Sequence, residues 1–432
     1  MVKIVHRLKS PVFRQQPVFQ HIMKNQAEVR MRGFLRRTPV SELRLLIRKH
    51  CGMLNKEYVS LEQLGGRVLA EGIISPENVP GFKRSAMDGY ALRAEETFGA
   101  TSYAPLEFRL LGEITPGSSF EGRVGTGEAV RIMTGGPVPE GADAVLVAEH
   151  AEEEEEKIRV LQPVPPGKHI GMVGEDVCRG DRLFEAGRRL RPQDVGVLAS
   201  TGLARAEAVR RPVMDLLITG NELLKPGEAP SGICIVDSNS LMLRQLAERD
   251  GAVVNSTVHL KDDRTRIKKA LLDSRADLIC MTGGTSVGVE DHAPTLLEEI
   301  GTLLVHGIPM RPAAPTGFGL IGDTKVFLLP GNPVSCFSAY DCFVGPALRL
   351  MGGLPEQWPY RSVRLPLAEK IASQLGRIEY VRLRIEKDKA FPIASGGASI
   401  LSSTTRADAF LLTDEASEGF ASGAEVEVWL YE

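Results

Sequence analysis

Residues 276–291 read ADLICMTGGTSVGVED, an apolar run followed directly by a glycine-rich turn and two acids. A run such as Leu278 to Met281 is typical of a strand that is buried on both faces, as in a parallel sheet. The glycines that follow permit positive φ angles and let backbone N–H groups approach a ligand closely. The stretch therefore predicts a buried strand ending in a turn. That turn either holds an anion beside a metal bound by Asp291, or is an ordinary strand-to-helix connection.

The same alternation of strand and helix extends over residues 211–352 and predicts a doubly wound parallel sheet. Three of the predicted strands end in polar turns that contain glycine, at 219–222, 283–288 and 330–335. Ligands bind at the carboxyl ends of such strands, near the point where the strand order reverses. Helix N-termini at this edge add partial positive charge that suits a phosphate or another oxyanion.

The remaining segments have a different composition, and the whole chain is predicted to be an α/β plus β multidomain protein. A helix is expected to begin near Pro39, and a short capped helix is expected over 60–70. The acidic run 152–156 is interpreted as the solvated turn of a hairpin. The predicted domains outside the sheet are a basic N-terminal extension (1–37), a small mixed domain (38–75 and 166–210), an inserted β domain (76–165) and a C-terminal β barrel (353–432).

Bulk properties exclude several classes of protein. The 52 basic and 55 acidic residues give a net charge of −3, so no global basic field favours nucleic acid. The six cysteines form no CxxC pair, which favours burial in a reducing cytoplasm over a zinc site. No segment reaches the roughly 20 apolar residues of a membrane span, and we expect a cytoplasmic protein. The basic extension has Glu28 as its single acid, and it is interpreted as a solvated tail rather than a targeting segment.

Acidic residues follow the predicted strands at the edge where the glycine turns lie. They are Glu222, Asp262 or Asp263, and Asp291. Hard oxygen ligands, with no cluster of histidine or cysteine, favour Mg²⁺ over Zn²⁺. Each acid taken singly also fits an ordinary surface carboxylate.

Four motifs, in this chain order, closely resemble the MoeA-type molybdopterin molybdenumtransferases, the family that includes the E domain of gephyrin. They are SAMDGYA (85–91), RIMTGGPVP (131–139), GGTSVG (283–288) and LPGNPVS (329–335). The resemblance covers about residues 38 to 432 and leaves only the N-terminal extension outside.

The resemblance implies an elongated homodimer that inserts molybdate into adenylylated molybdopterin and releases AMP with the help of Mg²⁺. Neutralising charge at a phosphoanhydride needs a cation held by acids. Placing molybdate against two thiolates needs backbone N–H groups and a few cations. A molybdopterin adenylyltransferase and recipient molybdoenzymes are further candidate partners. Molybdate and tungstate, two tetrahedral dianions of similar size, are not distinguished.

The resemblance also carries site residues onto this chain, with Asp88 and Thr134 expected to reach the sheet edge of the other subunit. The alternatives are that Asp88 caps the turn at Gly89 and Tyr90, and that the Thr134 hydroxyl satisfies the backbone. The residues are, for catalysis, Asp88, Thr134, Asp176, Glu222 and Asp291; for cofactor binding, Gly283, Gly284, Thr285, Ser286, Gly288, Arg311, Pro330, Gly331, Asn332 and Ser335; and for Mg²⁺, Glu222, Asp263 and Asp291.

The chain departs from the family pattern at two places. The family's Gly-Asp-Glu-Leu turn has Asn221 as its second residue, which removes one negative charge beside the predicted metal. The family's Lys-Pro-Gly-Lys-Pro reads RPAAP at 311–315, and a further family lysine falls at Gly307, next to His306. Only Arg311 keeps a cation, so we expect weaker oxyanion binding or cations supplied from elsewhere. A nucleotide or pyrophosphate hydrolase and a molybdopterin-binding scaffold without turnover remain alternative functions.

Overall fold

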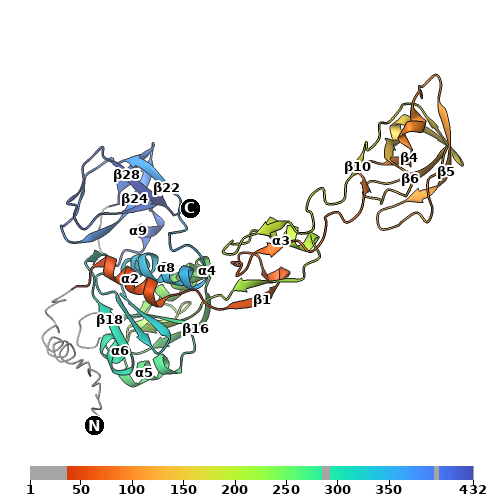
Figure 1. Ribbon diagram of the computed structural model, residues 1–432. Helices are drawn as coiled ribbons and strands as arrows, with labels where there is room; N and C mark the ends of the chain where they lie inside the picture. The colour runs from red at the N-terminus through yellow and green to blue at the C-terminus, as the bar shows by residue number, and fades with distance from the viewer. Residues whose placement is uncertain (1–36, 285–291, 394–397, 432) are drawn as a thin grey trace, which may run out of the picture. The chain divides into compact units, whose positions relative to one another are not determined.

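The structure is a computed structural model that describes residues 37–284, 292–393 and 398–431 (Figure 1). The chain divides into two compact units. One unit ends at Asn55 and resumes at Val209, and the other spans Lys56–Ala208. Each unit is described by itself below.

A six-stranded sheet forms the centre of the first unit, in the order β16-β13-β17-β21-β20-β18. The first four strands of this order are parallel, which confirms the predicted parallel sheet. The last two run antiparallel to their neighbours because a short turn joins β20 to β21, and the sequence analysis did not predict them. The bounds are β13 Val213–Thr219, β16 Val253–Leu260, β17 Leu278–Thr282, β18 Thr302–His306, β20 Gly317–Ile321 and β21 Thr324–Leu329.

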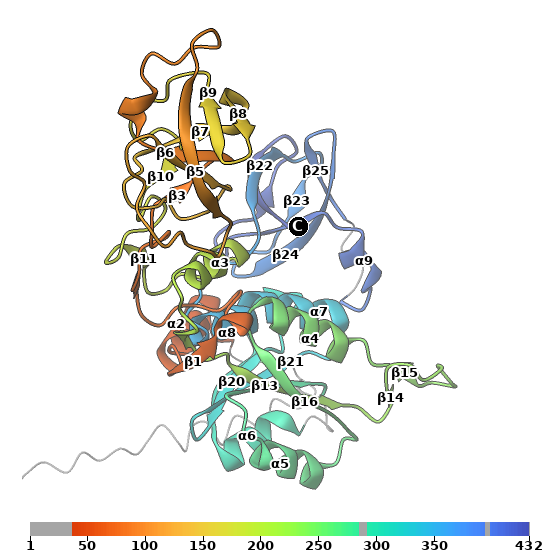
Figure 2. The same ribbon diagram turned by 90° about the vertical axis from the view of Figure 1, so that its right-hand side faces the viewer.

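Helices cover both faces of this sheet (Figure 2), which explains why β17 is apolar along its whole length and fully buried. Leu217 packs with the helices on one face, whereas its neighbours Leu216 and Ile218 belong to the core on the other face. Successive strand residues point to opposite faces, so both cores draw on the same strand. The first face carries α5 (Arg264–Asp273) and α6 (Ala293–Ile300); the second carries α2 (Val40–His50), α4 (Asn239–Arg249), α7 (Pro333–Ala339), the π-helix η4 (Tyr340–Val344) and α8 (Gly345–Met351).

Helix α2 differs from the prediction, which assigned residues 38–75 to the small mixed domain. Its buried residues Val40, Leu43 and Ile47 belong to the core of the α/β sheet. The Thr38 N–H also donates to the Gly307 carbonyl at 3.0 Å. The helix has the expected apolar stripe, but a stripe alone does not specify which core it covers. The other predicted domain boundaries stay a prediction.

The C-terminal strands form a sheet in the order β19-β24-β26-β28-β22, and β25 pairs with β24. An isolated parallel bridge between Leu367 and Ala390 joins the end of β22 to β25, which brings the sheet round toward the predicted barrel. The bounds are β19 Met310–Arg311, β22 Ser362–Pro366, β23 Ile371–Ala372, β24 Ile378–Glu386, β25 Lys389–Pro392, α9 Ser402–Thr405, β26 Ala409–Leu412, β27 Gly419–Phe420 and β28 Glu425–Leu430. A short arm of β14 (Leu223–Leu224) and β15 (Ile235–Val236) extends from the α/β part (Figure 2).

The second unit contains the predicted β domain, a six-stranded sheet in the order β7-β4-β6-β5-β9-β8. The acidic run lies on β8 and its turn to β9, so the predicted hairpin is confirmed. One of its acids, Glu153, is not simply solvated, because its carboxylate accepts from Arg131 and from the Tyr90 hydroxyl. The bounds are β4 Gly89–Leu92, η2 Ala94–Thr97, β5 Leu106–Ile114, β6 Glu128–Ile132, β7 Ala144–Val147, η3 Ala148–His150, β8 Ala151–Glu154 and β9 Lys157–Val160.

Three two-stranded pairs and one helix complete this unit. The helix predicted over 60–70 is wrong: only Leu61–Gln63 form a 3₁₀ turn, and Val68 and Leu69 make isolated β-bridges instead. Gly66 adopts a φ of +75°, which ends the helical turn. The pairs are β1 (Lys56–Ser60) with β12 (Arg205–Val209), β2 (Ile73–Ile74) with β11 (Arg182–Phe184), and β3 (Arg84–Ser85) with β10 (Ile170–Gly171); the helix is α3 (Pro192–Ser200).

Two further expectations concern the whole chain. All six cysteines are free thiols, and four of them are buried. No helix within the described residues is both long enough and apolar enough to cross a membrane.

Candidate functional site

The strand order of the α/β sheet reverses between β13 and β17. From β13 the chain moves to β16 on one side, and later to β17 and β21 on the other. The carboxyl ends of β13, β17 and β21 carry the three polar turns predicted from the sequence. This is the position at which open α/β sheets bind ligands.

The three turns lie against one another. Gly283 has a φ of +82°, and a Cβ placed on it would lie 2.0 Å from the carbonyl oxygen of Thr219 at the end of β13. The same Cβ position on Gly331 would lie 3.7 Å from the Gly283 Cα. The Thr219 hydroxyl donates to the Thr282 carbonyl at 3.3 Å, which links the β13 turn to the β17 turn. Only glycine fits position 283, so this motif glycine has a steric role in bringing the turns together.

The neighbouring acids Asp262 and Asp263 have different surroundings. Asp262 Oδ2 accepts from the Asn221 N–H at 3.1 Å, and the Asp262 N–H donates to Asn221 Oδ1 at 3.3 Å. Asp263 instead caps α5, because its carboxylate accepts from the N–H groups of Thr265 and Arg266 at 2.9 and 3.0 Å. Asp262 is therefore the acid that lies at the β13 turn. Asn221, which stands where the family has an acid, fastens that turn to it.

The predicted metal site is only partly within the described residues. Glu222 is exposed at the β13 turn, where its carbonyl accepts from the Ile235 N–H at 3.0 Å. Thr285, Ser286, Gly288 and Asp291 lie outside the described residues. Among the residues that are described, no three His, Cys, Asp or Glu side chains gather closely enough to hold a metal ion. The Mg²⁺ site therefore stays a prediction.

The turn after β21 begins helix α7. Pro330 is buried, Asn332 is the N-terminal cap residue, and Ser335 lies buried in the first turn of the helix. The Asn239 side chain donates to the Gly331 carbonyl at 2.7 Å. The Asn239 Oδ1 atom is also buried but has no hydrogen-bond partner among the described residues. A buried orphan acceptor beside this turn is suited to a donor on a ligand.

Asp237 and His259 form a second polar pair at this edge, and the sequence analysis did not single them out. His259 Nε2 lies 2.8 Å from Asp237 Oδ2, while Asp237 Oδ1 accepts from the N–H groups of Asn239 and Ser240. The N-cap pattern DSNS at 237–240 is the signal that could have found them.

Arg311, the cation retained from the family motif, is exposed on β19 and pairs in register with Glu379 of β24. Burial raises the pKa of Glu379, and the charge of Arg311 opposes that rise. His306 ends β18 and is half-buried. The β19–β24 pairing thus connects the edge of the α/β sheet to the C-terminal sheet.

Arg382 on β24 is a buried cation that the sequence analysis missed. Its side chain donates to the Ser403 hydroxyl, its Nε has no partner, and no carboxylate pairs with it within the described residues. The segment that leads to Ser403 starts at the β21 turn, where the Val334 N–H donates to the Ala398 carbonyl at 3.0 Å. The Ser399 hydroxyl donates to Asn332 Oδ1 at 3.1 Å. A buried guanidinium without a counter-charge beside this turn is suited to an oxyanion.

In the second unit, Asp88 and Thr134 form a pair. Asp88 Oδ1 accepts from the Thr134 N–H at 2.7 Å and from its hydroxyl at 2.8 Å. These bonds, the backbone one first, lower the pKa of Asp88. Asp176 is exposed, and within the described residues it makes no hydrogen bond to either partner of the pair. The motif residues 88 and 134 therefore act together, whereas Asp176 stands apart from them.

Comparison with known proteins agrees with this architecture segment by segment. Residues 38–202 match the MoeA N-terminal region (domain I and II), residues 215–350 a probable molybdopterin binding domain, and residues 364–431 the MoeA C-terminal region (domain IV).

Similar proteins span the same length. The chain is 30% identical over 389 residues to the molybdopterin molybdenumtransferase of Staphylococcus aureus, covering 87% of this chain and 91% of that protein. It is 33% identical over 386 residues to the molybdopterin molybdenumtransferase 2 of Mycobacterium tuberculosis, covering 86% and 94%. The crystal structure of the molybdopterin biosynthesis MoeA protein of Pyrococcus horikoshii superposes with a TM-score of 0.77 at 31% identity, over 92% of this chain and all of that one. The chain belongs to the MoeA family.

Proposed function

We propose that this protein is a molybdopterin molybdenumtransferase that inserts molybdate into adenylylated molybdopterin and releases AMP. The observation that carries the proposal is the convergence of three glycine-containing turns at the reversal point of the sheet, in a chain similar to molybdenumtransferases over most of its length. Backbone N–H groups in these turns and the N-terminus of α7 would bind the phosphate end of the substrate. Asn239 Oδ1, buried and without a partner, would accept from a donor on the pterin.

We propose Asp262, rather than the predicted Asp263, as the second acid of a Mg²⁺ site with Glu222. Asp262 lies at the β13 turn, while Asp263 is occupied with capping α5. Asp291 keeps its predicted place as the third ligand. Mg²⁺ bound there would neutralise charge on the phosphoanhydride as AMP leaves.

We propose Arg382 and Ser403, with Arg311, as the groups that bind the oxyanion. A guanidinium offers two parallel N–H groups to a tetrahedral oxyanion, and burial strengthens that interaction. The Nε of Arg382 is available for it, because it has no other partner among the described residues. These residues would supply the positive charge that the missing family lysines leave out.

The assembly and location of the protein are part of the same proposal. We propose a homodimer in which Asp88 and Thr134 of one copy serve the sheet edge of the other. Asp176 keeps its predicted role in activity. Six free cysteines favour a reducing cytoplasm. An adenylyltransferase that supplies the substrate and molybdoenzymes that receive the product are the proposed partners.

The test is single-turnover release of AMP from molybdopterin-AMP by the purified protein with Mg²⁺. It is run with molybdate, with tungstate, and without oxyanion. We expect molybdate-dependent release that is lost in Glu222→Ala and kept in Glu228→Ala, an exposed acid nearby that only accepts from the Lys225 N–H.

Two results would contradict the proposal. Release of AMP that is indifferent to any oxyanion would make the protein a hydrolase. Tight binding of molybdopterin-AMP without release under any condition would make it a scaffold.

A further inference from the structure

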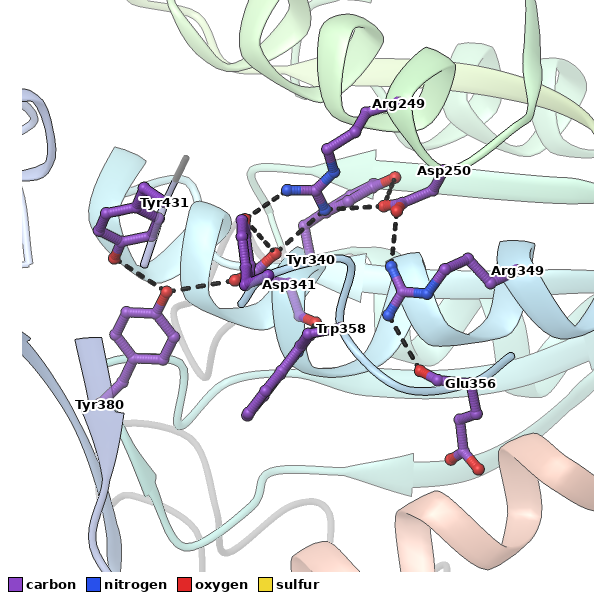
Figure 3. A network of polar contacts seen from close by, with 10 residues as sticks. Arg249, Asp250, Tyr340, Asp341, Arg349, Glu356, Trp358, Tyr380 and Tyr431 are labelled. Carbon is purple, nitrogen blue, oxygen red and sulfur yellow. Dashed lines mark hydrogen bonds and ion pairs between the residues drawn. The ribbon is translucent and has the colours of Figure 1, made fainter. Parts of the chain in front are cut away.

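A buried network of polar side chains joins the end of α4, the π-helix η4 and the C-terminal sheet (Figure 3). Its centre is Asp341, which is fully buried. Asp341 Oδ1 accepts from Arg249 at 3.1 Å and from the Tyr360 hydroxyl at 3.0 Å. Asp341 Oδ2 accepts from the Tyr380 hydroxyl at 3.2 Å, and Tyr380 shares a second hydrogen bond with Tyr431 at 3.0 Å.

Tyr380 stands two residues before Arg382 on β24, so the two side chains are on the same face of the strand. Their Cα atoms are about 7 Å apart along the strand. The Tyr380 ring stacks on Phe410, with centroids 4.6 Å apart, and meets the edge of Phe337 on α7 at 6.3 Å. Helix α7 begins at the β21 turn, so the face that carries Arg382 packs against the helix that leads from the candidate site.

The ring contacts alone do not fix the position of β24 along its own length. Stacked rings slide over one another at little cost, because dispersion contacts are weak individually and non-directional. A hydrogen bond to a buried carboxylate is directional and costly to lose. Arg382 cannot set its own position either, because among the described residues it has only the Ser403 hydroxyl as a partner. The Asp341–Tyr380 bond is therefore the directional tie nearest to Arg382 on this face.

We propose that Tyr380 is a positioning residue for the oxyanion site: its hydroxyl, held by Asp341, fixes β24 so that the Arg382 guanidinium is aimed at the bound molybdate. The inference rests on the oxyanion role proposed above for Arg382. Tyr380 itself touches no substrate. It acts through the strand that it shares with Arg382.

Equilibrium dialysis of molybdate against the full-length protein tests this, alongside the single-turnover assay of AMP release. Tyr380→Phe keeps the ring contacts and removes only the hydroxyl, and we expect it to raise the Kd for molybdate roughly tenfold. Tyr360→Phe is the matched control, because it removes a hydroxyl from the same carboxylate but lies outside β24. It should leave the Kd unchanged while lowering stability by a similar amount.

A double variant separates positioning from a general loss of stability. If Tyr380 acts through Arg382, then Tyr380→Phe combined with Arg382→Met binds molybdate no more weakly than Arg382→Met alone. A Kd for Tyr380→Phe equal to wild type, or fully additive effects in the double variant, would overturn the inference. So would wild-type protein that binds no molybdate.

The same design keeps the two proposals apart. Wild-type protein that binds molybdate but releases no AMP would refute the proposed function, and the comparison of Kd values would still decide the role of Tyr380. Should Tyr380→Phe fail to fold, Tyr431→Phe removes the other hydroxyl partner of Tyr380 and gives the same comparison.

Discussion

The carboxylate of Asp88 accepts two hydrogen bonds from Thr134, one from its backbone N–H at 2.7 Å and one from its hydroxyl at 2.8 Å. Asp88 directly precedes β4, and Thr134 follows β6 by one residue. The two strands pair antiparallel with Gly89 opposite Ile132, so the sheet register brings the two motifs together. Two motifs that are 46 residues apart in sequence thus form one exposed, ionised group.

The first prediction concerns this pair. Thr134→Val removes the hydroxyl and keeps the backbone N–H, so the pKa of Asp88 should rise toward its ordinary value without reaching it. We expect AMP release to fall roughly tenfold, the cost of one hydrogen bond to a charged group. A ¹³C titration of the Asp88 carboxyl measures the pKa. Thr126→Val, an exposed threonine of the same domain without contact to Asp88, should change neither quantity. An Asp88 pKa equal to wild type would refute the coupling.

The second prediction concerns the contact between two turns. Gly283→Ala would place a Cβ 2.0 Å from the Thr219 carbonyl oxygen, so the β13 and β17 turns must separate. Gly322 is the matched control, because it also has a positive φ (+56°) but an open space around its Cβ position. We expect Gly322→Ala to cost about 1 kcal/mol of backbone strain and to keep full activity. Gly283→Ala should abolish AMP release. Equal activity in the two variants, measured in the single-turnover assay, would contradict the steric role of Gly283.

The parts of the fold that the sequence predicts are those with a local cause. Leu278 to Thr282 form an unbroken apolar run because helices cover both faces of β17, and that pattern was sufficient to place the strand and its turn. The 3.6-residue stripe of α2 likewise predicted a helix. It could not tell which core the helix covers, because two apolar surfaces are equally acceptable partners for a stripe.

The candidate site was predicted less completely, for a physical reason. Arg382 belongs to the run YVRLRI, in which its alternation with apolar residues is typical of an exposed strand position. It is buried because β24 packs against α7 and α9, elements 30 or more positions before it and about 20 after it, and no local pattern encodes that contact. Asp263, in contrast, precedes Arg264 to Asp273 as an N-cap residue, a local signal from which its capping role could have been predicted.

The third prediction separates the two adjacent acids. Asp262→Asn should raise the Mg²⁺ concentration needed for half-maximal AMP release at least roughly tenfold, because one oxygen ligand loses its charge. Asp263→Ala should leave the Mg²⁺ requirement unchanged and lower the free energy of unfolding by about 1 kcal/mol, the usual cost of losing an N-cap. Magnesium titrations of AMP release and urea unfolding curves measure the two effects. The opposite assignment of effects would restore Asp263 as the metal ligand.

The fourth prediction concerns acid stability of the α/β unit. Asp277, just before β17, accepts from the Arg210 guanidinium at 2.7 and 2.8 Å and from the Val213 N–H at 2.8 Å. Burial raises the pKa of Asp277, but the bonds from Arg210 and Val213 outweigh it and the net shift is downward. The folded pKa therefore lies below the unfolded value of about 4. Stability from this pair is complete above that value and is lost as the pH falls through the lower, folded pKa.

Arg210→Gln tests the sign of this linkage. We expect the free energy of unfolding to fall by about 1–2 kcal/mol at pH 7, because one partner of a half-buried ion pair is removed. The difference from wild type should shrink below about pH 4, where Asp277 becomes protonated in the unfolded chain and then in the folded one. Arg264→Gln breaks an exposed pair with Glu299 at 2.6 Å and should cost about 0–1 kcal/mol at pH 7. Urea unfolding at pH 7 and pH 3 gives all four differences. A deficit in Arg210→Gln that grows as the pH falls would mean that Asp277 is stabilised in its protonated form, against the geometry of its three hydrogen bonds.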